Sequence, residues 1–259
     1  MAGYRPIFEM LLREENPAAD DALAAVLIGG DPPTVRAATE TLLARNRPAG
    51  LQGIVAAYHH LDEASRQIVH ARSDRLFRVL RESLSSRNEQ TRLNVLEIIR
   101  DGSFYRASYL IETCLQDRVP AVRQAAADTL YELAEKLLQE VPAPGEPLPG
   151  DPDAIRARML ELESHAEDRR QLVSAIGEAI TCYNAHLQPK VIEAGMWFAD
   201  DLGIKLWTPI STPGSRAMRA AIAILENSDD PRLAPFAMAA MQRAEFRPYV
   251  VKMLGSCSD

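Results

Sequence analysis

The sequence predicts an all-α fold, an α-solenoid of stacked antiparallel helix pairs, and three observations support this prediction. Apolar residues recur at steps of three and four residues, as in "RVPAVRQAAADTLYELAEKLL" at 118–138. Aromatic residues make up only 6% of the 259 residues, while alanine and leucine are abundant, and this favours close helix packing over a β-sandwich. Segments with the same pattern also return at intervals of 26 to 31 residues.

The recurring segments align on an arginine. They are "DPPTVRAATETLLA" around Arg36, "DEASRQIVHARSD" around Arg66, "RNEQTRLNVLEIIRDG" around Arg92 and "DRVPAVRQAAADTLYEL" around Arg123. The stretches between them carry helical patterns of their own, at 18–28, 48–61, 74–84 and 103–115. Because neither helix of such a pair buries its apolar face alone, successive pairs must stack to form a continuous core.

Two of these segments carry a family resemblance. "DPPTVRAATETLL" and "AVRQAAADTLYEL" resemble the second helix of HEAT and HEAT-like repeats, in which Asp-Pro, Val-Arg and an Ala-rich amphipathic helix recur. The period of roughly 30 residues is similar to the short bacterial type of this repeat. The resemblance implies that acids and arginines form a structural ladder between adjacent repeats. Its candidate members are Asp31 and Arg36, Asp62 and Arg66, Glu89 and Arg92, and Asp117 and Arg123.

A proline-rich stretch interrupts the period. "QEVPAPGEPLPGDPD" holds five prolines and two glycines, which exclude a helix interior. We therefore expect HEAT-like repeats over 1–139, a proline-rich loop or linker over 140–153, and degenerate helical repeats over 154–259 that continue or cap the solenoid. The loop is either an exposed connection or a docking segment for a partner.

Charge and composition restrict the partners. The formal net charge of −7 disfavours a general nucleic-acid binder. No apolar run reaches the roughly 18 residues of a membrane span, and "MAGYRPIFEMLLREEN" lacks the features of a secretory signal. The widely separated Cys114, Cys182 and Cys257 have no metal spacing and cannot all pair internally. We expect a cytoplasmic protein without a membrane partner.

Sequence motifs for catalysis are absent. The chain has no Gly-rich phosphate loop, GxSxG, HExxH or CxxC motif. "YHHLDE" at 58–63 offers His59, His60, Asp62 and Glu63 as ligand types, with His70 further on. Adjacent helical histidines point about 100° apart and rarely chelate one ion together. We interpret this motif as a helix end and predict neither a metal nor another cofactor.

Surface side chains in and beyond the repeats are candidates for contact with a partner. "HARSDRLFRVLRESLSSR" spaces four arginines three apart, which predicts a basic stripe on one helix, either partner-binding or simply solvated. The two tryptophans lie where the repeat is most irregular, as interface anchors or as plugs of a core. The candidates are Arg72, Arg75, Arg78, Arg81, Gln124, Asp128, Tyr131, Trp197 and Trp207.

These patterns predict a binding protein that is not an enzyme. We expect a scaffold or adaptor that holds another protein or a peptide on the concave face of the solenoid. One alternative is a HEAT-like enzyme, of the DNA glycosylase or chromophore-lyase type, and another is a structural subunit of a larger assembly. The sequence leaves the identity of the partner and the oligomeric state open.

Overall fold

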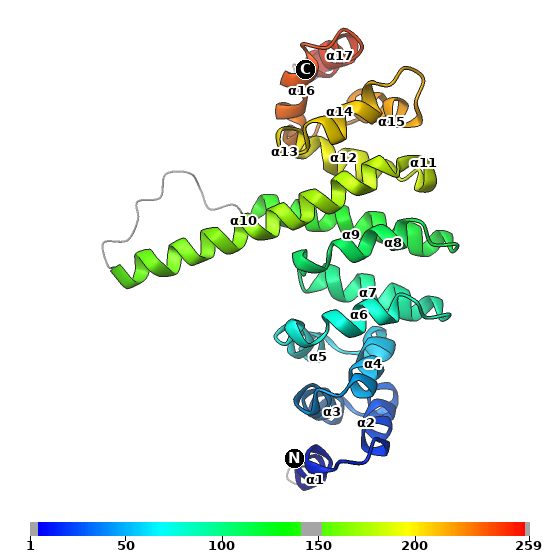
Figure 1. Ribbon diagram of the computed structural model, residues 1–259, viewed down its shortest axis with the longest axis vertical. Helices are drawn as coiled ribbons and strands as arrows, with labels where there is room; N and C mark the ends of the chain where they lie inside the picture. The colour runs from blue at the N-terminus through cyan, green and yellow to red at the C-terminus, as the bar shows by residue number, and fades with distance from the viewer. Residues whose placement is uncertain (1–4, 141–151, 257–259) are drawn as a thin grey trace. The chain divides into compact units, whose positions relative to one another are not determined.

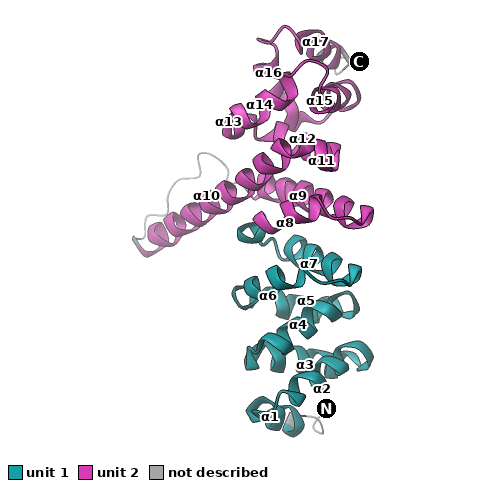
Figure 2. Ribbon diagram, turned by 45° about the vertical axis from the view of Figure 1, so that its right-hand side comes forward, with its two compact units in different colours: residues 1–107 teal, residues 108–259 magenta. Residues whose placement is uncertain are grey.

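The computed structural model describes residues 5–140 and 152–256, which form helices and turns (Figure 1). These two ranges contain no β-strand, so the predicted all-α class is confirmed. The chain divides between Ala107 and Ser108 into two compact units, coloured separately in Figure 2. None of the helices in the described ranges is both long and apolar enough to cross a bilayer.

The first unit stacks helices in pairs. Helix α2 packs against α3 and α4, α3 also packs against α1 and α5, and α4 packs against α6 and α7. This alternation is the arrangement that the repeat pattern predicts. The elements of this unit are α1 (Arg5–Arg13), α2 (Ala18–Gly29), α3 (Pro32–Arg45), α4 (Pro48–Ala57), η1 (Tyr58–His60), α5 (Glu63–His70), η2 (Ser73–Arg75), α6 (Phe77–Ser83), α7 (Glu89–Asp101) and η3 (Tyr105–Ala107).

Local chemistry sets where these helices begin and end. The Asp31 carboxylate accepts a hydrogen bond from the Thr34 backbone N–H and so caps α3, whose first residue is Pro32. Asn88 caps α7 in a similar way through the Gln90 N–H. Helix α3 ends at Asn46, which adopts a left-handed conformation with φ 52°. Polar capping residues therefore delimit the repeats.

The helices predicted over 74–84 and 103–115 are shorter than expected. The first is divided into η2 and α6, and the second into η3 and α8 (Tyr109–Leu115). Before η3 the chain turns tightly: a Cβ atom on Gly102 would lie 2.4 Å from the Phe104 ring, and Ser103 has φ 51°. The Phe104 side chain therefore packs beside Gly102, and the left-handed Ser103 separates η3 from the end of α7.

The second unit is built around α9 and α10. Helix α9 packs against α8 and α12, α10 packs against α8, α12 and α14, and α15 packs against α14 and α17. Its elements are α8, α9 (Pro120–Gln139), α10 (Pro152–Thr181), α11 (Tyr183–His186), α12 (Pro189–Trp197), α13 (Ala199–Leu202), α14 (Ile204–Ser211), α15 (Arg216–Asn227), η4 (Pro231–Leu233), α16 (Ala234–Ala240) and α17 (Arg247–Ser256).

Helix α10 is 30 residues long, and only its second half is buried. Its buried positions begin at Leu172, while the first half extends beyond the other helices of the second unit (Figures 1 and 2). The predicted loop over 140–153 ends earlier than expected, because Pro152 and Asp153 belong to α10. Proline is favourable in a first helical turn, where its missing N–H has no helical acceptor. Residues 141–151 lie outside the described ranges.

The boundary between the compact units falls inside the first region expected from the sequence. Helices α8 and α9 belong to the second unit because α8 packs against α10 and α9 packs against α12. The proline-rich stretch therefore interrupts the second unit in the sequence. It does not mark the boundary between the compact units.

Candidate partner-binding site

The arginines of the expected ladder bind mainly to backbone carbonyl groups. Arg66 Nε donates to the Leu61 carbonyl oxygen at 3.1 Å, and Arg123 NH1 donates to that of Asp117 at 2.8 Å. Arg92 and Arg36 make corresponding bonds, to the carbonyl oxygens of Ser86 at 2.7 Å and Pro32 at 3.3 Å. Three of these bonds tie a helix to the loop that precedes it. These arginines therefore orient their own repeat.

The acids of the ladder have several roles. Asp62 accepts the Ser65 N–H at 2.8 Å and caps α5; this hydrogen bond, aided by the charge of Arg36 from the preceding repeat, lowers the pKa of Asp62. Asp117 accepts the Val119 N–H at 2.8 Å, while Glu89 lies exposed in the first turn of α7.

Arg66 makes the ion pairs that join two repeats, with Asp101 at 3.1 Å and Glu97 at 3.5 Å on α7.

A deeply buried ion pair of the first unit was not predicted. Arg45 at the end of α3 pairs with Asp20 on α2 through Nε and Oδ1 at 2.6 Å, and their side chains are 1% and 2% exposed. Arg45 also donates to the carbonyl oxygens of Leu11 and Glu14. These bonds join α3 to α2 and to the end of α1. Nothing in the repeat pattern marks this arginine.

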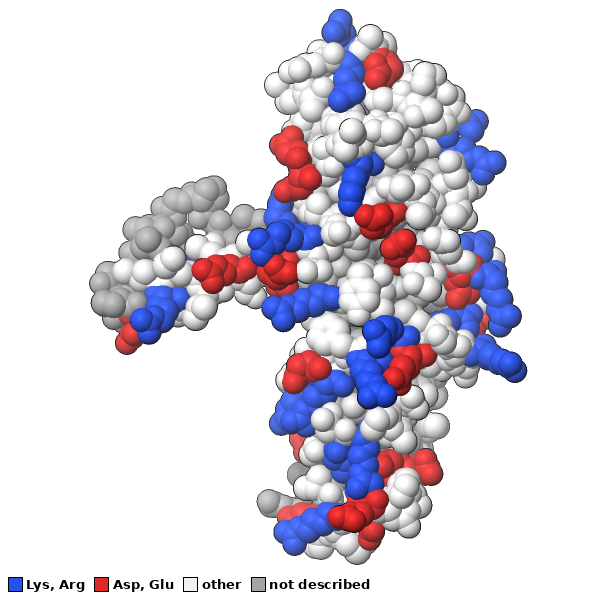
Figure 3. Space-filling model, in the orientation of Figure 1, with Lys and Arg blue, Asp and Glu red and all other residues white. Residues whose placement is uncertain are grey.

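The four arginines expected to form a stripe lie on two short helices and in the turn before them. Arg72 precedes η2, Arg75 ends it, and Arg78 and Arg81 lie on α6. Arg75 donates to the Leu43 carbonyl oxygen at 2.5 Å, and Arg78 pairs with Glu82 at 2.8 Å. The predicted stripe on a single helix is therefore wrong, because the chain turns between η2 and α6. In Figure 3, acidic and basic side chains are interspersed on the visible face of the first unit.

Four other candidates come together in the second unit. Gln124 donates to Asp128 at 3.0 Å, and Asp128 pairs with Lys190 at 2.7 Å. The Lys190 ammonium lies 5.3 Å from the centre of the Tyr131 ring, which lies 4.7 Å from that of Trp197. One continuous set of contacts therefore links α9 to α12. The sequence proposed these residues separately and could not predict that they touch.

An arginine that was not among the candidates extends this network. The Arg232 guanidinium on η4 lies 4.0 Å from the ring centre of Trp197, pairs with Glu135 at 2.7 Å and also binds Asp230. Burial alone would raise the pKa of Asp230, but hydrogen bonds from Arg232 outweigh this effect and lower it. The same acids raise the pKa of Arg232. Arg232 is therefore held as a cation between two helices and a short turn.

Tyr131 completes this network with a carboxylate. Its hydroxyl donates to Glu193 Oε1 at 3.3 Å. Burial raises the pKa of Tyr131 to about 12, and burial also raises the pKa of Glu193. The Tyr131 hydroxyl and the Glu193 carboxyl group thus satisfy each other's hydrogen-bonding capacity in a partly buried place. Trp197, which contacts the Tyr131 ring, is only 5% exposed. This network stabilises the wall of a groove.

The groove beside Trp197 is open and has a volume of about 650 Å³. Its lining comes from α9, the end of α12 and the region of η4, and comprises Glu135, Leu138, Gln139, Trp197, Asp230, Pro231, Arg232 and Pro235.

The other tryptophan occupies a different place. Trp207 on α14 stacks on Phe236 with ring centres 4.9 Å apart, and the Arg243 guanidinium lies 4.1 Å from its ring centre. It also lines a shallow pocket with Ile204, which is 79% exposed.

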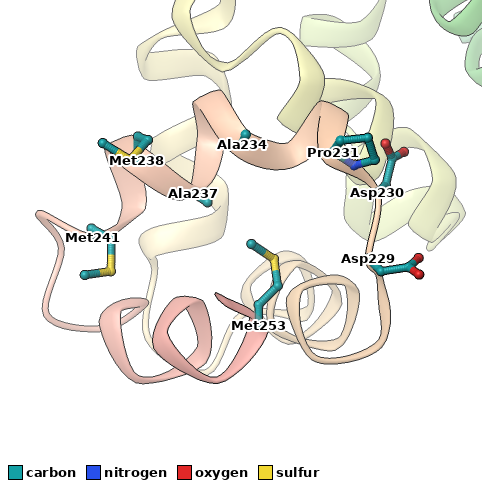
Figure 4. Close-up of a pocket in the computed structure, with 8 residues that line it drawn as sticks. All are labelled: Asp229, Asp230, Pro231, Ala234, Ala237, Met238, Met241 and Met253. Carbon is teal, nitrogen blue, oxygen red and sulfur yellow. The ribbon is translucent and has the colours of Figure 1, made fainter. Parts of the chain in front are cut away.

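A second, apolar pocket adjoins the groove and shares Asp230 and Pro231 with it (Figure 4). Its volume is about 220 Å³. In Figure 4 the side chains of Met238, Met241 and Met253 surround the hollow between α16 and α17. The complete lining is Asp229, Asp230, Pro231, Ala234, Ala237, Met238, Met241 and Met253. We call this lining the methionine pocket.

The methionine pocket combines an adaptable wall with an acidic rim. Met238 is 71% exposed, and methionine side chains adjust readily to the shape of a ligand. Asp229 is exposed at one end, whereas the neighbouring Asp230 is already bound to Arg232. The pocket can therefore bury an apolar group and present a carboxylate to a cation beside it.

Comparison with protein families agrees with this architecture. Residues 109–137, which form α8 and most of α9, match the HEAT repeat family model. The chain contains a HEAT repeat. The matched HEAT repeat contains Leu130, fully buried between helices, and Tyr131 of the polar network. A search of curated proteins found no match for this HEAT-like chain.

The histidine-rich motif of the HEAT-like protein serves local structure. Asn94 Nδ2 lies 3.0 Å from His59 Nδ1, and the Tyr58 hydroxyl lies 2.7 Å from His70 Nε2. Asp62 is the cap of α5. In the part of the chain that the structure describes, no three His, Cys, Asp or Glu side chains are grouped so that they could hold a metal ion.

The methionine pocket was missed by sequence reasoning, although a signal was present. In "FAMAAMQ" two methionines stand three apart in an alanine-rich stretch, which is separated by four residues from the acidic "DDP". Methionines on helices most often belong to a core, so the pattern alone does not predict a pocket. Only the position of Met253 on α17 shows that these side chains enclose a hollow.

Proposed function

We propose that this HEAT-like protein is a non-catalytic adaptor that binds a short segment of another protein in the methionine pocket. The segment carries a large apolar side chain with a lysine or arginine next to it. Stacked helical repeats commonly present such binding surfaces. The observation that carries the proposal is a methionine-lined hollow with an exposed carboxylate, Asp229, at its edge.

The size of the methionine pocket suits a single side chain. An engineered apolar cavity of about 150 Å³ binds a benzene ring, so about 220 Å³ accommodates the side chain of a leucine, methionine or phenylalanine. Burial of such a side chain contributes about 1.5 to 3 kcal/mol, which is one anchor of a peptide and not a whole interface. The groove beside Trp197 adjoins the pocket and can accept the flanking residues.

Charge determines which neighbour of the apolar residue is favoured. The carboxylates that line the pocket are Asp229 and Asp230, and Asp230 is already neutralised by Arg232. Asp229 is therefore the group that attracts a basic residue of the bound segment. The same negative charge repels a phosphate backbone, and this favours a protein partner over a nucleic acid.

The proposal that the protein is not an enzyme rests on the state of its polar groups. Glu135 and Asp230 are occupied by Arg232, and Glu193 accepts the Tyr131 hydroxyl. General acid–base catalysis needs a group that can reach a substrate proton. The methionine pocket instead offers apolar walls.

Peptide binding tests this function. The probes are fluorescent peptides with one central leucine or phenylalanine followed by arginine, and the same peptides with alanine at the centre. We expect the first kind to bind and the second kind to bind at least about tenfold more weakly. Equal binding of both kinds, or binding of neither, would contradict the proposal.

Three variants test the position of the binding site. Ala234 is exposed and lines the methionine pocket, so Ala234→Trp should block the pocket while the fold is retained. Ala223→Trp on α15 is the matched control, because Ala223 is also an exposed helical alanine and lies outside the pocket lining. We expect loss of peptide binding in the first variant and normal binding in the second. In Asp229→Lys, binding should no longer be favoured by the arginine of the peptide. Peptides with a central leucine should still bind more tightly than those with a central alanine.

A further inference from the structure

The first half of α10 exposes apolar side chains that no described helix covers. Met159 is 54% exposed, Leu160 is 61% exposed and Leu162 is 42% exposed. The buried positions of the helix begin only at Leu172, where α10 packs against α8, α12 and α14. Most surface helices of a folded protein place their apolar face against a core. This half of α10 instead leaves Met159, Leu160 and Leu162 exposed. It projects from the other helices of the second unit (Figures 1 and 2).

Four apolar positions in this half of α10 follow the spacing of a coiled-coil seam; three of them are exposed and Ile155 is half-buried. Ile155, Met159, Leu162 and Ala166 are separated by four, three and four residues, which is the a and d spacing of a heptad repeat. Leu160 lies outside this spacing, next to Met159 on the helix. We call the four positions the α10 seam. The α10 seam spans about 16 Å along the helix at 1.5 Å per residue.

We propose that two copies of this chain pair antiparallel through the α10 seam. In this arrangement Met159 of each copy lies opposite Leu162 of the other, and Ile155 lies opposite Ala166. The seam is therefore complementary to itself: its two larger side chains meet at the centre, and each isoleucine meets an alanine near the ends. A two-fold axis between Leu160 and Glu161 relates the copies, as is usual for homodimers.

The charges beside the α10 seam favour the same pairing. Arg156 and Glu163 flank the seam on one side and are both exposed. In an antiparallel pair Arg156 of each copy lies opposite Glu163 of the other copy. The two-fold symmetry therefore gives two such pairs of opposite charge. Both signs of charge are visible along the projecting part of α10 in Figure 3. Flanking charges of this kind set partner choice and orientation in coiled coils.

The attachment of α10 explains why the pair is antiparallel. The second half of the helix is fixed among α8, α12 and α14 of the second unit. A parallel pair would bring two of these units together at the same end of the seam. An antiparallel pair places them at opposite ends, where their bulk does not obstruct contact. Because the seam is short, the dimer should be weak and its population should rise with concentration.

Sedimentation velocity of the full chain over about a hundredfold concentration range tests this proposal. We expect a monomer at low concentration and a growing dimer population at high concentration. Met159→Glu combined with Leu162→Glu should leave a monomer throughout the range. Leu160→Glu is the matched control, because Leu160 lies outside the seam and is more exposed than Met159 or Leu162. This variant should dimerise like the wild type.

A charge exchange tests the orientation with variants that keep the apolar seam intact. Glu163→Arg or Arg156→Glu alone should weaken the dimer about tenfold or more, because like charges then face each other. Both substitutions in one chain should restore it, since each pair again joins opposite charges. A parallel pair does not bring these two residues together, so the double variant would then remain weak.

Several results would overturn the proposal: a wild-type monomer at all concentrations, a dimer that survives the two seam substitutions, an equal loss in Leu160→Glu, or no rescue in the charge exchange. Circular dichroism should show unchanged helix content in every variant. Peptide binding by the methionine pocket is measured separately on the same variants and does not depend on the seam, so the two proposals fail independently.

Discussion

Arg232 places its guanidinium carbon 4.0 Å from the centre of the Trp197 ring, and the same side chain pairs with Glu135 at 2.7 Å. These contacts join η4, α12 and α9, although Arg232 and Glu135 are 97 residues apart in the sequence. A cation over an indole face and an ion pair hold this side chain from two directions. Arg232 therefore stabilises the wall shared by the groove and the methionine pocket.

Arg232→Ala should lower the free energy of unfolding by about 1 to 2 kcal/mol, because it removes a cation–π contact and partly exposed ion pairs. Arg243→Ala is a suitable control, since its guanidinium lies 4.1 Å from the Trp207 ring centre and pairs with no carboxylate of the described residues. The control should lose only about 0.5 to 1 kcal/mol. Urea unfolding followed by tryptophan fluorescence measures both. An equal loss in the two variants would show that the ion pairs of Arg232 contribute nothing.

Leu130→Ala should be much more destabilising than Arg123→Ala. Leu130 on α9 is fully buried, so its truncation should cost about 2 to 5 kcal/mol. Arg123 is half-buried and donates to two carbonyl oxygens of the preceding loop, so its loss should cost about 1 kcal/mol. Thermal melting of both variants compares them. If Arg123→Ala melted at the lower temperature, the repeat arginine would matter more than the apolar packing of α9.

Asp20→Asn should destabilise the first unit by about 3 to 5 kcal/mol, because it leaves the buried guanidinium of Arg45 without its charged partner. Its neighbour Asp21 is exposed on the same helix turn, so Asp21→Asn should change the free energy of unfolding by less than about 0.5 kcal/mol. Denaturant unfolding of the two variants makes the comparison. Similar stability of both would mean that the buried pair does not hold α2 and α3 together.

His186 should make the second unit less stable in mild acid. It is 5% exposed, and burial lowers its pKa below the usual 6.5. The folded state therefore binds the proton less well than the unfolded chain. Its contribution to stability is fully present above about pH 6.5 and declines as the pH falls below that value.

His186→Asn retains an acceptor for the Gln188 N–H but cannot titrate, so it isolates this effect. The variant should be less stable than the wild type at about pH 7.5, and this difference should shrink towards about pH 5. Urea unfolding across this range measures the difference. A constant difference would exclude His186 as the titrating group.

The sequence predicted the helices well where local chemistry decides them. The range 18–28 agrees with α2 within one residue, and Asp31 followed by prolines marks the start of α3. Apolar periodicity and capping residues act over a few positions, so they are legible in the chain itself. The prediction over 103–115 was less accurate, because Ser103 has a left-handed backbone and the first helical turn is the separate η3.

The binding surfaces depended on contacts between distant residues. Gln124, Asp128, Tyr131 and Trp197 were each proposed from the sequence, yet their union required Lys190, which was not a candidate. The four arginines of the expected stripe did not share a helix, since a turn separates η2 from α6. A helical wheel assumes a continuous helix, and it fails at such a turn.

The sequence by itself determined that this chain is an all-α repeat protein, because the apolar period, the caps and the recurring Val-Arg pattern are local properties. Tertiary structure alone decided that Arg45 binds Asp20 and that Met253 closes a pocket with Met238 and Met241. It also decided that Met159 and Leu162 of the α10 seam are exposed. These outcomes depend on which helix faces meet in space. That information lies in the packing of the whole chain and not in the spacing of neighbouring residues.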